Sequence, residues 1–166
     1  LNHHWLEAHS YFGWHQINSD APPDWHSNCF TGTKVYGAEK PWWQIPDFDR
    51  QLGDIKTVWE ASRFDWVISL AQSSSVGNLD DLSKLNNWLK NWSAYNPPYL
   101  GPNWKCGQEA SIRVIHLALA ALLLGQQHTS TEALQQLIAA HLQRIAPTIR
   151  YAIGQDNNHG TSEAAA

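Results

Sequence analysis

The sequence predicts an all-α fold in which helices stack as antiparallel hairpins behind an irregular amino-terminal segment. From Asp54 onward, apolar residues recur at spacings of three and four, which is the period of a helix with one buried face. No stretch shows the strict apolar and polar alternation of a half-buried strand. The connections between the periodic stretches are short, so successive helices are expected to run antiparallel. We therefore expect an irregular segment over 1–53 and one helical domain over 54–166.

The segment 1–53 is rich in aromatic residues and has no sustained period. It holds prolines at four positions and tryptophan at Trp5, Trp14, Trp25, Trp42 and Trp43. Because proline removes a backbone donor and interrupts regular structure, we predict loops here, with one short helix near Trp5.

The helical domain begins with two helices whose ends are marked in the sequence. The first is predicted to follow Asp54 as its cap and to run to about Gln72, with Ile55, Trp59, Trp66 and Leu70 near one face. The second follows Asn78 and buries Leu82, Leu85, Leu89 and Trp92. It is predicted to end at Asn96, because the residue before a proline is pushed out of the helical region.

Three more helices are predicted after Pro98. One runs from about Cys106 to Leu124 and is apolar nearly all round from Ile112, which predicts enclosure on several sides. Another opens at Thr129 with Glu132 in capping-box spacing and ends or kinks at Pro147. A last helix is predicted to begin at Gly160.

Composition excludes several classes of protein. The 11 basic and 15 acidic residues give a formal charge of −4, which excludes a strongly basic nucleic-acid-binding domain. The longest apolar run, 114–124, is much shorter than the roughly 18 residues of a membrane span. Cys29 and Cys106 define neither a metal site nor a redox motif, and their pairing is left open. The chain has no Met and starts at Leu1, which suggests a segment of a longer protein.

Two of the predicted helices carry similar sets of charged residues. Lys56, Glu60 and Arg63 share one face, and Glu109, Arg113 and His116 repeat the spacing after Asn103-Trp104. The ordinary interpretation is a solvated row of ion pairs. The second set lies in a very apolar helix, however, where charges need partners or a water-filled cleft. Two such helices could line a groove for a sugar, whose apolar face suits an indole and whose polar groups suit Arg, Glu and Asn.

A third polar group lies near the end of the chain, at Asn157, Asn158 and His159. These residues either form a turn that caps the next helix or present an amide and an imidazole to an anion at the start of that helix. At the other end, His3, His4, His9 and His15 match no zinc-binding spacing, so no metal is predicted. Phosphate-binding loops and nucleophile elbows are also lacking, and no cofactor is predicted.

Three groups of residues in this order resemble the heparinase II/III-like polysaccharide lyases and their alginate-lyase relatives. They cover about two-thirds of the chain, from Asp54 onward. They are Asp54-Ile55-Lys56 with Trp59-Glu60-Ala61-Ser62-Arg63-Phe64; Asn96-Pro97-Pro98 and Gly101-Pro102-Asn103-Trp104 with Glu109 and Arg113; and Asn157-Asn158-His159-Gly160-Thr161-Ser162-Glu163-Ala164-Ala165.

The resemblance implies an (α/α) toroid, here partial, built from helical hairpins around a central cleft. It also implies a partner, an acidic polysaccharide or oligosaccharide containing uronic acid, which the family cleaves by β-elimination. That reaction removes the proton on C5 of the sugar. The proton becomes acidic enough only when hydrogen bonds neutralise the neighbouring carboxylate. Family likeness also favours a periplasmic or secreted location.

Carried over by position, the resemblance makes Asn158 and His159 the residues that contact the substrate carboxylate. It places Glu60, Arg63, Asn103, Trp104, Glu109, Arg113 and Asn157 along the cleft as substrate-binding residues. The family takes its base and acid from a Tyr and a second His well after this pair, and this chain stops before them. A positioned acid or base contributes roughly 10²- to 10⁴-fold, so the chain alone is expected to be inactive and to need the missing carboxyl-terminal part of the same protein.

Two alternatives stay open at this point. One is a non-catalytic carbohydrate-binding or glycan-assembly protein that keeps the toroid. The other is a toroidal glycoside hydrolase, for which Glu60 and Glu109 are the available carboxylate pair.

Overall fold

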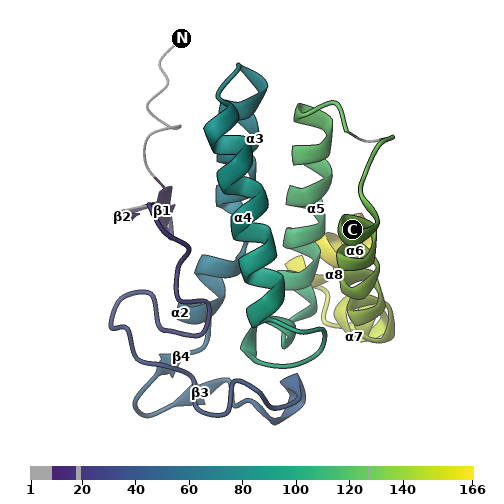
Figure 1. Ribbon diagram of the computed structural model, residues 1–166. Coiled ribbons are helices and arrows are strands. Elements are labelled where there is room, and N and C mark those ends of the chain that lie inside the picture. Colours follow the sequence, from purple (N-terminus) through teal and green to yellow (C-terminus); the bar gives the residue numbers. More distant parts are fainter. Residues whose placement is uncertain (1–8, 18–19, 127) are drawn as a thin grey trace.

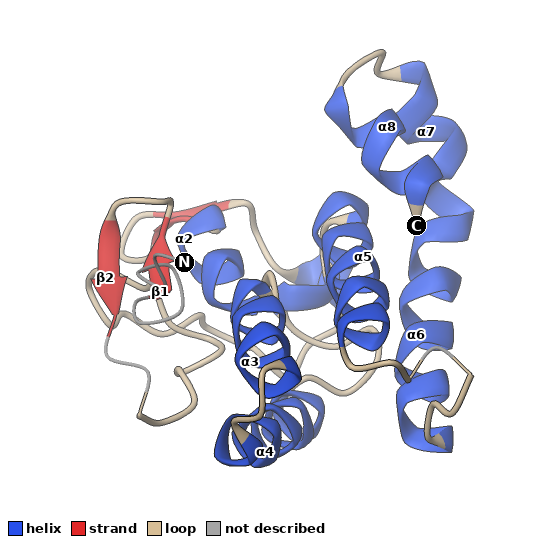
Figure 2. Ribbon diagram, turned by 90° about the horizontal axis from the view of Figure 1, so that it is seen from above, coloured by secondary structure: helices blue, strands red, loops and turns tan. Residues whose placement is uncertain are grey.

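The structure is a computed structural model that describes residues 9–17, 20–126 and 128–166 (Figure 1). Most of the described chain is helical, which confirms the all-α class. The four long helices are α3 (Asp65–Ser75), α4 (Leu79–Tyr95), α5 (Gly107–Leu123) and α6 (Glu132–Ile145). Figure 1 shows them as two successive hairpins, α3 with α4 and α5 with α6. Seen from above in Figure 2, α3 lies beside α5, while α4 packs against α3 and α6 against α5.

Shorter helices complete the domain. They are α2 (Lys56–Trp59), α7 (Ile149–Gly154) and α8 (Asn158–Ala165), together with the 3-10 turns η1 (Trp42–Gln44), η2 (Glu60–Ser62), η3 (Pro102–Trp104) and η4 (Ala146–Thr148). Helix α8 packs against α5 and α7. The structure therefore adds a short carboxyl-terminal helix pair to the two long hairpins.

The amino-terminal segment contains two small antiparallel ladders that the sequence did not predict. Strand β1 (His9–Tyr11) pairs with β2 (His15–Ile17), and β3 (Phe48–Asp49) pairs with β4 (Gly53–Asp54). Each strand has only two or three residues, and both residues of β3 are exposed, so no burial pattern could reveal them. The expected helix near Trp5 lies outside the described residues.

The prediction of one continuous helix from Asp54 to Gln72 is wrong. Helix α2 and turn η2 end at a break, and α3 starts after Phe64, whose φ is +68°. This left-handed conformation costs roughly 1–2 kcal/mol for a non-glycine residue. Burial of the Phe64 ring offsets that cost, since the ring centroid lies 5.3 Å from that of Trp66 and 5.0 Å from that of Trp92. The residue at the N-cap of α2 is Ile55 and not the predicted Asp54, although the Asp54 carboxylate accepts the Lys56 N–H at 2.9 Å just before the helix.

Helices α4 and α5 begin and end close to the predicted residues. The Asn78 side chain accepts the Asp81 N–H at 3.3 Å, and α4 ends just before Asn96 and Pro97. The expected enclosure of α5 is wrong for its carboxyl half, where Leu119, Leu122 and Leu123 are exposed. No helix in the described part of the chain is long and apolar enough to cross a bilayer.

The last helices begin at other residues than predicted, because other side chains cap them. Thr131, not Thr129, caps α6, because its hydroxyl oxygen accepts the Leu134 N–H at 3.4 Å. Thr129 lies in the preceding turn, where its backbone N–H donates to the Gln126 carbonyl. Helix α8 starts at Asn158, two residues before the predicted Gly160. The short helix α7 carried no recognised signal in the sequence.

Tryptophan side chains form much of the core instead of lining a groove. Trp25, Trp66, Trp88, Trp92 and Trp104 are buried together with Phe64 between the amino-terminal segment and α3, α4 and α5. A separate cluster around Ile55, Val58 and Trp59 fixes the amino-terminal segment to α2. The expectation that tryptophans beside Glu60, Arg63 and Glu109 face a sugar is therefore not met in this arrangement.

Candidate functional site

An ion cluster joins the turn before α3 to the first part of α5. The guanidinium of Arg63 binds Glu109 through two parallel hydrogen bonds, Nε to Oε2 at 2.9 Å and Nη2 to Oε1 at 2.8 Å. Its Nη1 donates to Glu60 Oε2 at 2.8 Å. Two buried carboxylates thus share one guanidinium, and the bidentate geometry fixes their separation from it.

Burial and pairing shift the pKa values of Glu60 and Arg63 in this cluster. Desolvation raises the pKa of Glu60, while the Phe12 N–H that it accepts and the charge of Arg63 oppose that shift. Hydrogen bonds to Glu109 raise the pKa of Arg63, so its guanidinium stays charged. The Arg63 side chain is 27% exposed, against 3% for that of Glu109. Arg63 is therefore the member of the cluster that faces solvent.

Neighbouring residues of the predicted charged rows lie elsewhere. The Lys56 ammonium forms no ion pair with Glu60 but a long, exposed pair with Asp54 at 3.9 Å. The 3-10 turn Glu60–Ser62 lies between Lys56 and Arg63, and the i, i+4, i+7 spacing holds only for a continuous α-helix. His116 Nδ1 lies 2.8 Å from the Arg63 carbonyl oxygen, and since a carbonyl only accepts, that nitrogen carries a hydrogen.

Asn103, Trp104 and Arg113 are brought together, but inside the protein. All three residues are fully buried. Asn103 Nδ2 donates to the Trp25 carbonyl and to Asn96 Oδ1, both at 2.8 Å, and Arg113 Nη2 donates to the Asn103 carbonyl at 2.6 Å. These side chains tie α5 to η3 and to the amino-terminal segment, and those of Asn103 and Arg113 present no surface to a ligand.

His141 is the partner of Arg113 that sequence reasoning missed. Arg113 Nε donates to His141 Nε2 at 2.8 Å, and His141 Nδ1 lies 2.8 Å from the Leu137 carbonyl oxygen. Arginine can only donate, so Nε2 must carry a lone pair and the imidazole is neutral with its hydrogen on Nδ1. Burial and the charge of Arg113 accordingly lower the pKa of His141 to about 3. Its spacing from Leu134, Leu137 and Ile145 on the apolar face of α6 was the available signal.

The Asn157–His159 group forms the start of α8. Asn157 caps the helix, since its Oδ1 accepts the His159 N–H at 2.9 Å. Asn158 is exposed, and its amide has no hydrogen-bond partner among the described residues. His159 is 32% exposed at its side chain, and its Nδ1 lies 3.6 Å from Oε1 of Glu163. The capping interpretation is confirmed for Asn157, while Asn158 and His159 have side chains accessible to a ligand.

Replacing Asn157 with Ala is expected to fray α8. Loss of a side-chain cap costs about 1 kcal/mol. Hydrogen exchange of the amides in α8 should then speed up about fivefold, while that of α4 stays unchanged. Equal acceleration in both helices would mean that Asn157 affects the whole fold instead of the start of α8.

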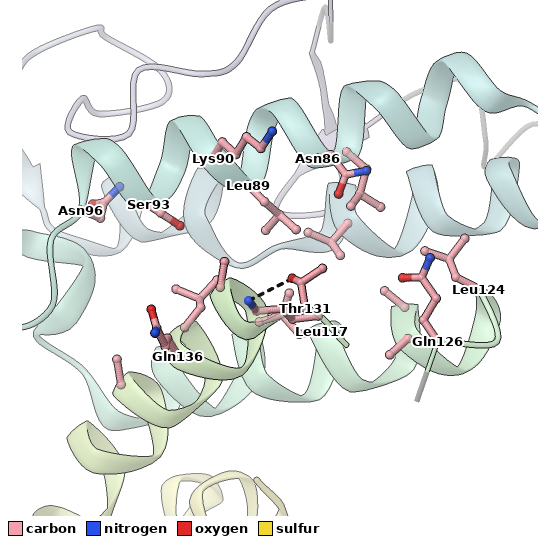
Figure 3. Close-up of a pocket in the computed structure, with 18 of the residues that line it drawn as sticks. Asn86, Leu89, Lys90, Ser93, Asn96, Leu117, Leu124, Gln126, Thr131 and Gln136 are labelled. Atoms are coloured by element: carbon pink, nitrogen blue, oxygen red, sulfur yellow. Dashed lines mark hydrogen bonds between the residues drawn. The ribbon is translucent and has the colours of Figure 1, made fainter. Parts of the chain in front are cut away.

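A cavity lies away from these charged groups. It has a volume of about 590 Å³ and opens between α4, α5 and α6, with walls mostly of leucine and alanine (Figure 3). Its polar lining residues are Asn86, Lys90, Ser93, Asn96, Gln126, Thr129, Thr131 and Gln136. Of the predicted site residues, only Trp104 lines it. The cavity lies between α4, which packs against α3, and α6, which packs against α5 on the same face of the α3–α5 pair (Figure 2).

Helix α5 connects the three groups of predicted site residues. It carries Glu109, which binds Arg63, and Arg113, which belongs to the buried network. Its first residue, Gly107, lies against the carboxylate of Glu163 from α8. The three groups of predicted site residues therefore all contact α5. Among the described residues, no hydrogen bond or ion pair joins Asn158 or His159 to Arg63.

Metal binding finds no support in the described part of the chain, where no three His, Cys, Asp or Glu side chains converge. His3, His4 and the side chain of His9 lie outside the described residues. Comparison with known proteins adds no assignment, because no family model, no curated protein and no solved structure matches the chain.

Proposed function

We propose that this chain forms part of a lyase-like toroid that binds a uronic-acid-containing polysaccharide, with Asn158 and His159 contacting the sugar carboxylate. The observation that carries the proposal is the start of α8, where an exposed amide with no hydrogen-bond partner among the described residues precedes a partly exposed imidazole. Both side chains can donate hydrogen bonds to a carboxylate. The order of the motifs resembling heparinase II/III-like lyases gives the class of ligand.

The chemistry assigned to these two residues is charge neutralisation. The Asn158 amide and the His159 Nε2–H of the imidazolium would each donate to a carboxylate oxygen of the uronate. As the C5 proton leaves, negative charge moves into that carboxylate, and donors already in place stabilise it without reorganising. Elimination also needs a base and an acid, and we assign neither role to a residue of this chain.

Arg63 is proposed as a second, weaker contact for an anionic sugar. Its guanidinium is held by Glu60 and Glu109 and has only part of its surface in solvent. Most of its charge is therefore neutralised within the protein. Asn103, Trp104, Glu109 and Arg113 then serve the site by supporting its framework and not by touching the sugar.

The non-catalytic carbohydrate-binding alternative differs only in the reaction and keeps the same contacts. The glycoside hydrolase alternative is less favoured, because Glu60 and Glu109 are both buried and both bound to Arg63. A hydrolase needs one carboxyl group that protonates the leaving group and a second that faces a water or the sugar. Incorporation of labelled solvent oxygen into product would separate hydrolysis from elimination.

Binding of an oligouronate to the chain tests the proposal. Asn158→Ala is expected to weaken binding roughly 10- to 100-fold, since a hydrogen bond to a charged group contributes about 1.5–3 kcal/mol. Titration calorimetry measures this directly. Asn87→Ala, which removes an exposed amide from α4, is the matched control and should bind as the unaltered chain does.

The ligand also has a matched control. The same oligosaccharide with its carboxylates reduced to alcohols should bind at least tenfold more weakly if the carboxylate is the group recognised. Equal binding of both sugars, or no binding of any oligouronate, would contradict the proposal. Formation of an unsaturated product by the intact protein, followed by its ultraviolet absorbance, distinguishes a lyase from a binding protein.

A further inference from the structure

Glu163 occupies an unusual position for an acidic side chain. Its side chain is 3% exposed, and Oε2 is buried with no hydrogen-bond partner among the described residues. It projects from the last part of α8 onto the first residue of α5, Gly107. A buried carboxylate normally needs a cation or hydrogen-bond donors, so the partners that it does have are informative.

One side chain within ion-pair distance of Glu163 is His159, one turn earlier on the same helix. Glu163 Oε1 lies 3.6 Å from His159 Nδ1, within ion-pair distance but longer than a hydrogen bond. This places Nδ1 toward the protein. The other ring nitrogen, Nε2, has no partner in the described structure, and the side chain is 32% exposed. The imidazole therefore has Nε2 on the side of the ring away from Glu163.

We propose that Glu163 is a positioning residue that orients the His159 ring and favours its protonated form, so that Nε2–H can donate to an anionic ligand. This inference rests on the proposed function of the start of α8. The inference adds a role for the Glu163 carboxylate at that site. Only a protonated imidazole donates from both ring nitrogens, and a neighbouring carboxylate favours that form.

The other charged and titratable groups near Glu163 come from the helices packed around it. Arg144 of α6 stabilises its negative charge, and Cys106, the residue before α5, lies close enough for Glu163 to raise the pKa of its thiol. On α7, Arg150 and Tyr151 make no described contact with the pair. Burial raises the pKa of Glu163, whereas His159 and Arg144 oppose that rise. His159 is thus the partly exposed member of a small charge group held by α5, α6 and α8.

Gly107 makes this arrangement possible. A Cβ atom at position 107 would lie 2.8 Å from Cδ, Oε1 and Oε2 of Glu163. This distance is shorter than the van der Waals contacts that Cβ atoms make in proteins, so the carboxylate would have to move. The backbone of Gly107 has no positive φ, so an alanine is compatible with the helix itself. Gly107→Ala would therefore displace the carboxylate by moving a flexible side chain, while its charge stays in the protein.

The test follows the His159 ring by NMR across a pH titration of the chain without ligand. Glu163→Gln keeps the shape of the side chain and removes its charge, and the midpoint of the His159 titration should move to lower pH by about half a unit. Gly107→Ala should move it in the same direction. Glu39→Gln removes an exposed charge elsewhere and should leave the midpoint unchanged.

Oligouronate binding gives a second readout that a purely structural role would not produce. Near neutral pH, Glu163→Gln and Gly107→Ala should both bind more weakly than the unaltered chain. Well below the His159 midpoint, where the ring is protonated in every variant, the affinities should converge. An affinity loss that is equal at all pH values would overturn the inference.

The two proposals fail in different ways. If the His159 midpoint is the same in Glu163→Gln, Gly107→Ala and the unaltered chain, the positioning role is wrong whatever the chain binds. If the midpoints shift as expected but no variant, nor the unaltered chain, binds an oligouronate, the proposed function is wrong and the Glu163–His159 coupling stands. Gly107→Ala keeps the test valid if Glu163→Gln does not fold.

Discussion

Acidification from pH 7 to pH 4 is expected to remove about 3 kcal/mol of stability through His141 alone. In the folded chain His141 is neutral, because Nε2 accepts from Arg113 and its pKa lies at about 3. In the unfolded chain the same side chain has a pKa near 6.5. Between these two values the unfolded state binds a proton that the folded state does not, so stability falls as pH falls.

Chemical denaturation at a series of pH values, followed by tryptophan fluorescence, measures this effect. His141→Gln keeps an acceptor for Arg113 and cannot titrate, so its stability should depend less steeply on pH than that of the unaltered chain. His128→Gln removes an exposed imidazole and should keep the original slope. The comparison between variants is needed because Glu60 and Glu163, whose pKa values are raised, act in the opposite direction. An unchanged slope in His141→Gln would contradict the assignment of a neutral, buried His141.

Removal of the Arg63 charge is expected to have a comparable effect. Arg63→Met leaves the buried carboxylates of Glu60 and Glu109 without their shared partner, and breaking a buried pair in this way costs about 3–5 kcal/mol. Because the Arg63 side chain is partly in solvent, we expect the lower end of that range. Lys56→Met breaks an exposed pair and should change the free energy of unfolding by less than about 1 kcal/mol.

A double-mutant cycle separates pairing from simple loss of the arginine. In Arg63→Met combined with Glu109→Gln, one of the two unpaired charges is gone, so the loss of stability should be smaller than the sum of the two single losses. Lowering the pH should also restore stability to Arg63→Met more than to the unaltered chain, since protonation neutralises the buried carboxylates that have lost their shared partner. Strict additivity of the two single variants would show that the bidentate contact contributes nothing.

The long helices were predictable because their signals are local. Asn78 before α4, Pro97 after it, and the apolar period of α5 and α6 each act within a few residues of the feature that they determine. The break at Phe64 was not predictable in the same way. Its left-handed backbone is held by rings of Trp66 and Trp92, and the second of these belongs to another helix.

The candidate site shows the same division. The cap at Asn157 and the neighbouring Asn158 and His159 could be placed at a helix start from the sequence, since capping depends on adjacent residues. Glu163 lay in the recognised motif, but its burial against Gly107 requires two helices to meet. The spacing of Glu109 and Arg113 suggested charges in an apolar helix without showing which of them faced solvent.

What the sequence alone determined is the helical class, most helix ends and the set of polar residues available for a site. Only the tertiary structure decided where their charges lie: Arg63 at the surface between two carboxylates, Arg113 inside with a neutral His141, and Glu163 beneath His159. The physical reason is that a charge can be buried only where distant segments bring it partners. Such partners depend on how helices pack, which no local pattern of residues records.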